Sequence, residues 1–165
     1  MPKKIIVGIT QRVDMIDSYG EQRDALDQRL INWVSQSKFI PISIPNTLID
    51  TSLPSGPQND LKDWLNTFKV DAILLSGGND IGDSFQRDIT EQYLLSWAEK
   101  NKKPVLGICR GMQMMGIYAG VELRKVNGHI GVMHKLINED KSCDLFPDLV
   151  NSFHNMVLGE CPDNF

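Results

Sequence analysis

Short apolar runs alternate along the chain with longer stretches in which apolar residues recur every three or four positions. Continuous apolar runs are typical of strands buried on both faces of a parallel sheet, whereas the wider spacing predicts one buried face of a helix. Pro41 lacks a backbone N–H, so the run that contains it is expected at an edge of the sheet. The four runs that predict the main strands are residues 4–10, 39–44, 72–75 and 105–108.

Three helices are predicted between these strands, and a fourth after the last strand. In the first, which is expected to begin near residue 21, four apolar residues fall on one helical face: Leu26, Leu30, Trp33 and Val34. The charged residues in and before this helix are interpreted as a solvated helix face and its approach. These residues are Asp14, Asp17, Arg23, Asp24, Asp27 and Arg29. The next two helices are expected over residues 61–68 and 90–101.

The remaining segments complete the predicted organisation. Residues 45–59 are rich in Pro, Ser, Asn and Gly and predict a loop, and three short strands are predicted at residues 121–123, 135–137 and 149–152. The alternation of strands and helices predicts an α/β fold, with a mostly parallel sheet covered by helices on both faces. Because no repeat or linker interrupts the pattern, residues 1–165 are expected to form a single domain.

Composition and charge exclude several classes of function. The net charge is −4 without a long run of Lys or Arg, so there is no electrostatic footprint for nucleic acid or an anionic membrane. No segment approaches the roughly 20 apolar residues of a membrane helix, and the first apolar run is too short for a signal peptide. The three cysteines and three histidines lack the spacing of a disulfide framework or a metal site. We therefore expect a reduced, cytoplasmic protein without a metal.

Two glycine-containing turns, residues 76–80 and 107–111, follow the third and fourth predicted strands. Ligands of parallel sheets bind beyond the carboxyl ends of the strands, which places the candidate site at the edge that these turns share. The second turn reads Gly-Ile-Cys-Arg-Gly, so Cys109 has the position of a nucleophile elbow with a thiol. Its sulfur is expected at a helix N-terminus, where the helix dipole favours an anion. The alternative, a cysteine that only fills the core, is less consistent with the flanking glycines.

Neighbouring groups have the chemistry that an acyl transfer needs. The N–H of Arg110 follows the nucleophile, and the N–H of Gly78 is expected on the adjacent strand end, so the two can stabilise an oxyanion. Gln113 lies one helical turn after Cys109 and is interpreted either as a substrate ligand or as a solvated or capping side chain. An acid–base partner is also required, usually a histidine. Each histidine taken singly is more typical of a structural or surface residue; they are His129, His134 and His154.

Three segments carry a resemblance to a known family. Ser-Gly-Gly-Asn-Asp at residues 76–80, Gly-Ile-Cys-Arg-Gly-Met-Gln at residues 107–113 and Val-Asn-Ser-Phe-His at residues 150–154 resemble class I glutamine amidotransferases, and more closely the γ-glutamyl hydrolases among them. Residues 8–12 and 19–30 are similar to a narrower group, the γ-glutamyl-CDP-amidate hydrolases of capsule phosphoramidate synthesis. The resemblance implies a flavodoxin-like three-layer sandwich.

The resemblance also implies a reaction. A thiolate attacks a γ-glutamyl amide of a small molecule, a γ-glutamyl thioester forms, and water releases glutamate without a cofactor. By family position Cys109 is the nucleophile, and Gly78 and Arg110 supply the oxyanion N–H groups. The residues implied to hold the glutamyl moiety are Gln113, His129, Gly131 and Val132. The sequence does not decide between a monomer and a homodimer.

The chain departs from the family pattern at the catalytic base. The family carries a His-x-Glu motif on a late strand, whereas none of the three histidines here is followed by Glu two positions on. His154 matches a segment that precedes the catalytic histidine in the family. We therefore expect a C-terminally truncated domain without the last strands of the sheet, with weak or no amidase activity. Turnover would point to His154 or His134 as a substitute base.

Three other interpretations remain open from the sequence. The chain can be a glutaminase subunit that supplies ammonia to a synthetase partner, or a binding remnant that keeps the pocket without the base. It can also belong to the glyoxalase and chaperone branch of flavodoxin-like cysteine proteins. The glycine turn at residues 76–78 and Gln113 favour the amidotransferase side.

Overall fold

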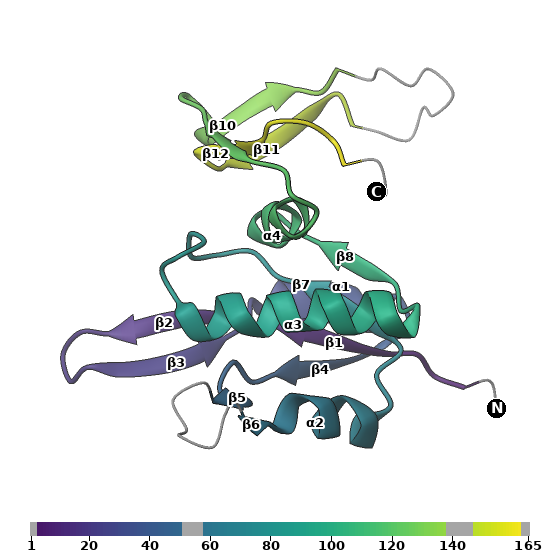
Figure 1. Ribbon diagram of the computed structural model, residues 1–165. Helices are drawn as coiled ribbons and strands as arrows, with labels where there is room; N and C mark the ends of the chain where they lie inside the picture. The colour runs from purple at the N-terminus through teal and green to yellow at the C-terminus, as the bar shows by residue number, and fades with distance from the viewer. Residues whose placement is uncertain (1–2, 51–57, 138–146, 163–165) are drawn as a thin grey trace.

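The protein is organised around a parallel sheet of four strands (Figure 1). The computed structural model describes residues 3–50, 58–137 and 147–162, so that Cys143 lies outside the described residues. The strand order is β4-β1-β7-β8, all neighbours being parallel. The strands are β1 (Ile6–Thr10), β4 (Ile40–Ile44), β7 (Ala72–Leu75) and β8 (Val105–Gly107). The four main strands and the edge position of Pro41 are thus confirmed.

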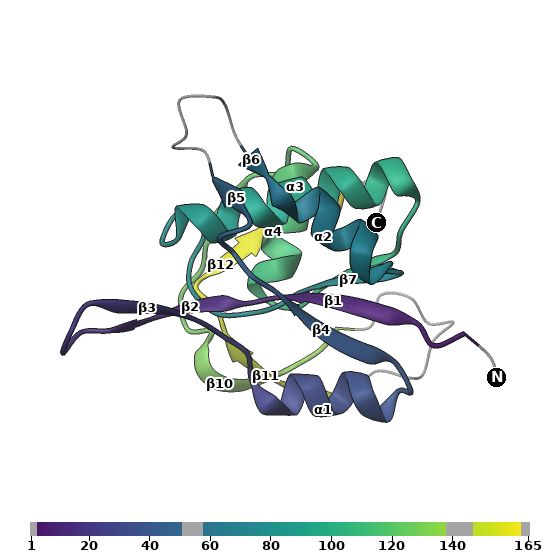
Figure 2. The same cartoon turned by 90° about the horizontal axis from the view of Figure 1, so that it is seen from below.

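Helices cover both faces of this sheet, which confirms the predicted three-layer α/β fold (Figure 2). One face carries α1 (Gln28–Gln36), and the other carries α2 (Asp60–Phe68), α3 (Phe85–Asn101) and α4 (Arg110–Tyr118). Side chains alternate along β7: Ile73 and Leu75 join the core under α2, α3 and α4, whereas Leu74 joins the core under α1. Burial on both faces explains why this strand is continuously apolar.

The first helix begins later than predicted, because a β-hairpin precedes it. Strands β2 (Arg12–Ile16) and β3 (Glu21–Ala25) pair antiparallel and extend away from the sheet (Figures 1 and 2). The signal is weak because four of the five residues of β3 are polar, so this strand lacks apolar alternation. In β2 Val13 and Met15 do alternate with polar residues, but they lie opposite Asp24 and Gln22. The charged residues read as a helix face are therefore mostly hairpin residues, a correction of the sequence interpretation.

Two charged residues of that group have structural roles instead. The Asp24 carboxylate accepts hydrogen bonds from the backbone and side-chain N–H groups of Asn46, at 2.9 and 2.8 Å. Asp27 is the N-cap of α1 and accepts from the Arg29 backbone N–H at 2.8 Å. The N-cap sets the start of the helix, because its side chain satisfies an N–H that has no partner within the helix.

Other boundaries also differ. Helix α3 begins at Phe85 rather than at residue 90, with Ser84 as its N-cap. The predicted loop over residues 45–59 contains two short strands, β5 (Ile49–Asp50) and β6 (Gln58–Asn59), and its residues 51–57 lie outside the described residues. No helix in the described part of the chain is long and apolar enough to cross a membrane.

The C-terminal part forms two antiparallel strand pairs on the far side of α4 from the main sheet (Figure 1). Strand β10 (Ile130–Lys135) pairs with β11 (Leu149–Phe153), and β9 (Leu123–Lys125) pairs with β12 (Met156–Leu158). The strand predicted at residues 149–152 is confirmed, whereas those predicted at residues 121–123 and 135–137 are displaced and β12 was missed. These strands are defined by pairing with segments far away in the sequence, so the local sequence does not predict their bounds.

Candidate active site around Cys109

Cys109 lies at the turn between β8 and α4, in the conformation of a nucleophile elbow. Its φ of 53° and ψ of −109° are uncommon for a residue with a side chain, and such backbone strain clusters at functional sites. Backbone hydrogen bonds fix the turn: Ile108 N–H donates to Leu75 O at 2.9 Å, and Gly111 N–H donates to Ile108 O at 2.9 Å. The thiol is free and exposed, and it stands as the N-cap of α4. A sulfur in this position is accessible to a substrate.

The glycines around Cys109 are required by close packing. A Cβ added at Gly111 would lie 2.2 Å from Leu75 O, and one added at Gly107 would lie 2.6 Å from the backbone of residues 111 and 112. Contacts this short do not occur for real Cβ atoms. The elbow can therefore form only if both positions lack a side chain, which is what the Gly-Ile-Cys-Arg-Gly pattern indicated.

The turn after β7 faces the elbow, as the shared strand edge predicted. A Cβ at Gly77 would lie 3.6 Å from the Cys109 Cβ. The next residue, Gly78, has a φ of 85°, which favours glycine. Asn79 then ties the turn to β2, because its side chain accepts from Val13 N–H at 2.8 Å and donates to Val13 O at 2.9 Å.

A cavity of about 330 Å³ opens beside the elbow. Of the residues singled out from the sequence, the structure brings five to it: Gly78, Cys109, Arg110, Gln113 and His154. The other lining residues are Asn79, Asp80, Asp83, Phe153 and Asn155. The cavity therefore joins the nucleophile, both residues expected to supply oxyanion donors, and one histidine.

The residues expected to hold a glutamyl group are not all found there. The lining of this cavity does not include His129, Gly131 or Val132, which lie just before and within β10. Gln113 does line it, but its side-chain N–H donates to Met156 O at 2.9 Å and only 6% of the residue is exposed. In this structure, that donor of Gln113 fastens β12 to α4.

The three histidines form a cluster at the β10–β11 pair: His129 lies just before β10, His134 within it and His154 just after β11. The ring centroid of His129 lies 5.1 Å from those of both His134 and His154. Ser152 donates its hydroxyl hydrogen to His129 O at 2.7 Å, so its oxygen is left to accept from His154 Nδ1 at 3.3 Å. That assignment leaves Nε2 of His154 as the nitrogen with a free lone pair. Burial lowers the pKa of His154, and the neighbouring His129 and His134 rings lower it further.

This lowered pKa predicts a dependence of stability on pH. Below about pH 6.5 the unfolded chain binds a proton at His154 that the folded chain resists, so the free energy of unfolding falls as pH falls. The stability that comes from keeping His154 neutral is fully present above the usual histidine pKa and is lost as the pH falls below it. Urea unfolding at pH 7.5 and pH 5.5 measures it. We expect His154→Gln to reduce the difference between the two pH values, and an unchanged difference would contradict this role.

A buried polar cluster lies behind the elbow, and two of its members, Arg87 and Glu91, were not predicted from the sequence. Arg87 and Glu91 on α3 are fully buried, and Arg110 is 2% exposed. Burial lowers the pKa of Arg87, and the charge of Glu91 opposes that shift. The signal that could have found the cluster is the spacing of Arg87 and Glu91, which fall at i and i+4 on the face of α3 that carries Leu94 and Ala98.

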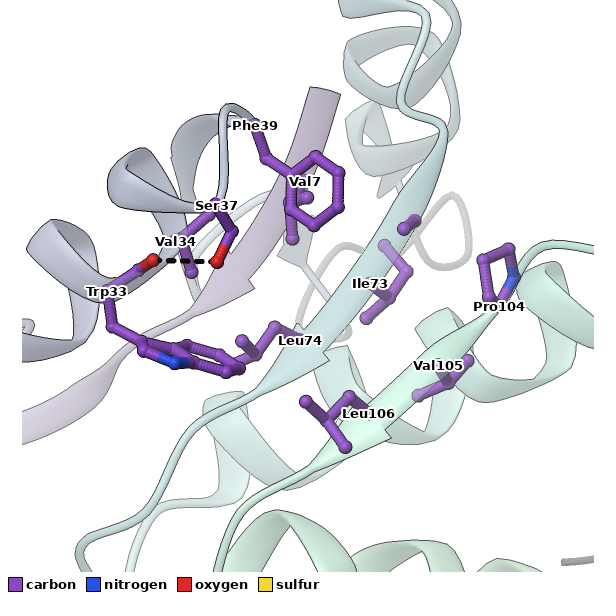
Figure 3. A pocket seen from close by; sticks show the side chains of 11 residues that line it. Val7, Trp33, Val34, Ser37, Phe39, Ile73, Leu74, Pro104, Val105 and Leu106 are labelled. Carbon is purple, nitrogen blue, oxygen red and sulfur yellow. Dashed lines mark hydrogen bonds between the residues drawn. The ribbon is translucent and has the colours of Figure 1, made fainter. Parts of the chain in front are cut away.

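A second cavity, of about 200 Å³, lies on the α1 face of the sheet (Figure 3). Its walls are apolar side chains from β1, β7, β8 and α1, with Trp33 and Leu106 about half exposed at its rim. The Ser37 hydroxyl there already donates to Trp33 O at 3.1 Å. Because its lining includes no titratable group, this cavity has no means of acid–base or nucleophilic catalysis.

Among the described residues, no group of three or more His, Cys, Asp and Glu side chains could hold a metal ion.

The chain is similar to known proteins of one family. The family model for glutamine amidotransferase class-I matches residues 14–158. A γ-glutamyl-CDP-amidate hydrolase of Campylobacter jejuni is 32% identical over 163 residues, which cover 93% of this chain and 72% of the relative.

Two solved structures share the fold. A candidate GMP synthase component from Thermoplasma acidophilum superimposes with a TM-score of 0.64 at 17% identity, over 99% of this chain and 71% of the other. A glutamine amidotransferase of Thermotoga maritima superimposes with a TM-score of 0.59 at 14% identity, over 98% of this chain and 64% of the other.

Proposed function

Because this chain belongs to the class I glutamine amidotransferase family, whose members hydrolyse C–N bonds, we propose that it cleaves a γ-glutamyl amide of a small molecule through a thioester on Cys109. The observation that carries the proposal is the exposed thiol of Cys109, held at a positive φ between two required glycines and opposite the turn at Gly77. This is the arrangement that an attacking sulfur needs at the carboxyl edge of a parallel sheet.

The proposed reaction has two stages. The Cys109 thiolate attacks the γ-carbonyl carbon, a C–S bond forms, and the carbonyl oxygen takes the negative charge toward the N–H groups of Gly78 and Arg110. The C–N bond then breaks as the leaving amine takes a proton. Water attacks the thioester in the second stage, glutamate leaves, and the thiolate is restored. No step calls for a metal or a redox cofactor.

His154 is proposed as the acid–base group within these 165 residues. It lines the cavity with Cys109, and the proposed tautomer leaves Nε2 able to accept a proton. Because no His-x-Glu pair occurs in this sequence, no carboxylate two residues on orients the imidazole or stabilises its charged form. We therefore expect release of the amine to be slow.

The proposed leaving group rests on the similarity to the relative from Campylobacter jejuni. We propose γ-glutamyl-CDP-amidate as the substrate, with a nucleotide phosphoramidate as the amine half. The test is release of glutamate from this compound and from glutamine, measured side by side with the purified 165-residue chain. We expect slow release, faster from the nucleotide amide. Preference for glutamine that rises with an added synthetase would overturn the substrate in favour of a glutaminase role.

A further inference from the structure

We infer that Arg87, held by Glu91, is a positioning residue that sets the turn after β7 so that its main-chain donor faces the carbonyl oxygen attacked by Cys109. This inference rests on the proposed function. It concerns two residues that are fully buried and are not themselves among the residues that line the cavity.

Arg87 binds the turn through several carbonyl groups at once. Its Nη2 donates to Ser76 O at 2.7 Å and to Gly77 O at 3.1 Å. Its Nη1 donates to Gly78 O and, at 3.1 Å, to the side-chain oxygen of Asn79. A planar guanidinium presents its donors in a fixed fork, so contacts of this kind define the orientation of each peptide group they reach.

Orientation of these carbonyls determines the direction of the N–H groups. In a trans peptide the C=O of one residue and the N–H of the next point in opposite directions. When Arg87 holds Gly77 O toward α3, the Gly78 N–H must point away from α3. Gly78 lines the cavity of Cys109, so this is the group expected to receive the oxyanion. Arg87 therefore acts on the oxyanion site without contacting the substrate.

Glu91 connects this turn to the other strand ends. One carboxylate oxygen accepts from Arg87 Nε at 3.1 Å and from Thr10 Oγ1 at 2.8 Å, and the other accepts from Arg110 Nη1. Thr10 in turn accepts from Ser76 N–H at 3.0 Å. One buried carboxylate thus joins the ends of β1 and β7 to the first turn of α4. That turn contains Arg110, the residue expected to supply the second oxyanion donor.

Stability alone does not account for such a cluster. Desolvating charges is costly, and apolar residues of similar volume often stabilise a fold as well as a buried ion pair does. A hydrophobic cluster, however, could not bind three consecutive carbonyls of a turn. Fixing the direction of those peptide groups is the property that the charged arrangement adds.

Two alkylating reagents separate positioning from general structure. With a glutamine-like chloroketone the thiolate adds to the carbonyl, whose oxygen becomes an oxyanion. The sulfur then bonds to the adjacent carbon, chloride leaves and the carbonyl re-forms. Iodoacetamide reacts by direct displacement of iodide by the thiolate and forms no oxyanion. We would measure the rates of both reactions at Cys109, by peptide mass spectrometry, in the full chain and in Arg87→Lys. Lysine keeps the charge but lacks the planar fork. Thr10→Val is the second variant, because it removes the bridge between Glu91 and Ser76.

Controls come from the exposed end of the same helix. Lys100→Met and Glu99→Gln change exposed residues of α3 that lie far from the turn in sequence and outside the cavity. We expect both to react with each reagent as the unmodified chain does. For Arg87→Lys we expect the chloroketone rate to fall by about 10²-fold, the usual effect of a small misplacement, with the iodoacetamide rate nearly unchanged. Thr10→Val should show a smaller loss of the same kind.

Two results would overturn the inference. The first is that Arg87→Lys and Thr10→Val lose the same fraction of their rate with both reagents, or keep the full rate with both. Arg87 would then have no specific effect on the oxyanion site. Failure of the unmodified chain to react with the chloroketone at Cys109 would instead refute the proposed function, and the inference with it.

Discussion

Replacing Cys109 with alanine will abolish covalent labelling of the chain by a glutamine-like chloroketone. The sulfur is the atom that bonds to the reagent, and alanine leaves no nucleophile at the elbow. Because the thiol is exposed and the turn carries no side-chain hydrogen bond to the sulfur, the change should leave the fold intact. Intact-protein mass spectrometry measures the label, and peptide mapping locates it.

Cys161 provides the matched control. It is also free and exposed, but it lies near the C-terminal end and outside the cavity lining of Cys109. We expect Cys161→Ala to label at the rate of the unmodified chain. Labelling of Cys109→Ala at that same rate would show that the reagent reacts elsewhere and that the elbow is not the reactive site.

Gly111→Ala is expected to have the second large effect, on folding as well as reactivity. The added Cβ would lie 2.2 Å from Leu75 O, a backbone atom that cannot move without displacing β7. Overpacking of this kind costs roughly 3 kcal/mol of unfolding free energy or more. We expect a large loss of stability in urea unfolding and loss of chloroketone labelling, because β7 and α4 both carry the site.

Gly77→Ala tests whether this loss is specific to the elbow. Its added Cβ would lie at ordinary contact distances, 3.6 Å from the Cys109 Cβ and 3.7 Å from Ile108 O. We therefore expect little change in its unfolding free energy. Equal stability of Gly111→Ala and the unmodified chain would mean that α4 and β7 do not pack as closely as the structure places them.

The central fold could be predicted because its signals are local. Continuous apolar runs identified β1, β4, β7 and β8, since strands buried on both faces contain few polar residues. The elbow was predictable for a related reason: only glycine fits at residues 107 and 111, so the packing requirement is written in the sequence itself. The nucleophile and the facing turn then followed from the rule that strand ends meet at one edge.

The hairpin of β2 and β3 and the late start of α1 were not predictable in this way. Four of the five residues of β3 are polar, and β2 offers only Val13 and Met15 as alternating apolar residues, so the pattern was too short to separate the hairpin from the helix that follows. The start of α1 depends on Asp27 as N-cap, and several other acidic residues nearby could have filled that position equally well.

The candidate site was only partly visible in the sequence. Arg87 and Glu91 meet residues 10, 76–79 and 110 through tertiary contacts, and charged residues four positions apart on a helix are usually a solvated pair. The segment before and within β10 was assigned to the substrate by resemblance, but its residues 129, 131 and 132 are not part of the lining of the Cys109 cavity. Pairing of β10 with β11 decides where these residues lie, and that pairing is not encoded locally.

Attack of the Cys109 sulfur on a γ-glutamyl carbonyl is tested most directly by trapping the acyl-enzyme. γ-Glutamyl p-nitroanilide is suited to this because its leaving amine is a weak base and departs without an effective general acid. We would mix it with the chain, quench with acid and map the adduct by mass spectrometry. The predicted result is a γ-glutamyl group on Cys109 that accumulates because hydrolysis of the thioester is slow. Two results would contradict attack by Cys109. One is release of p-nitroaniline without an adduct on Cys109, both in the unmodified chain and in His154→Gln. The other is a γ-glutamyl adduct on a different residue.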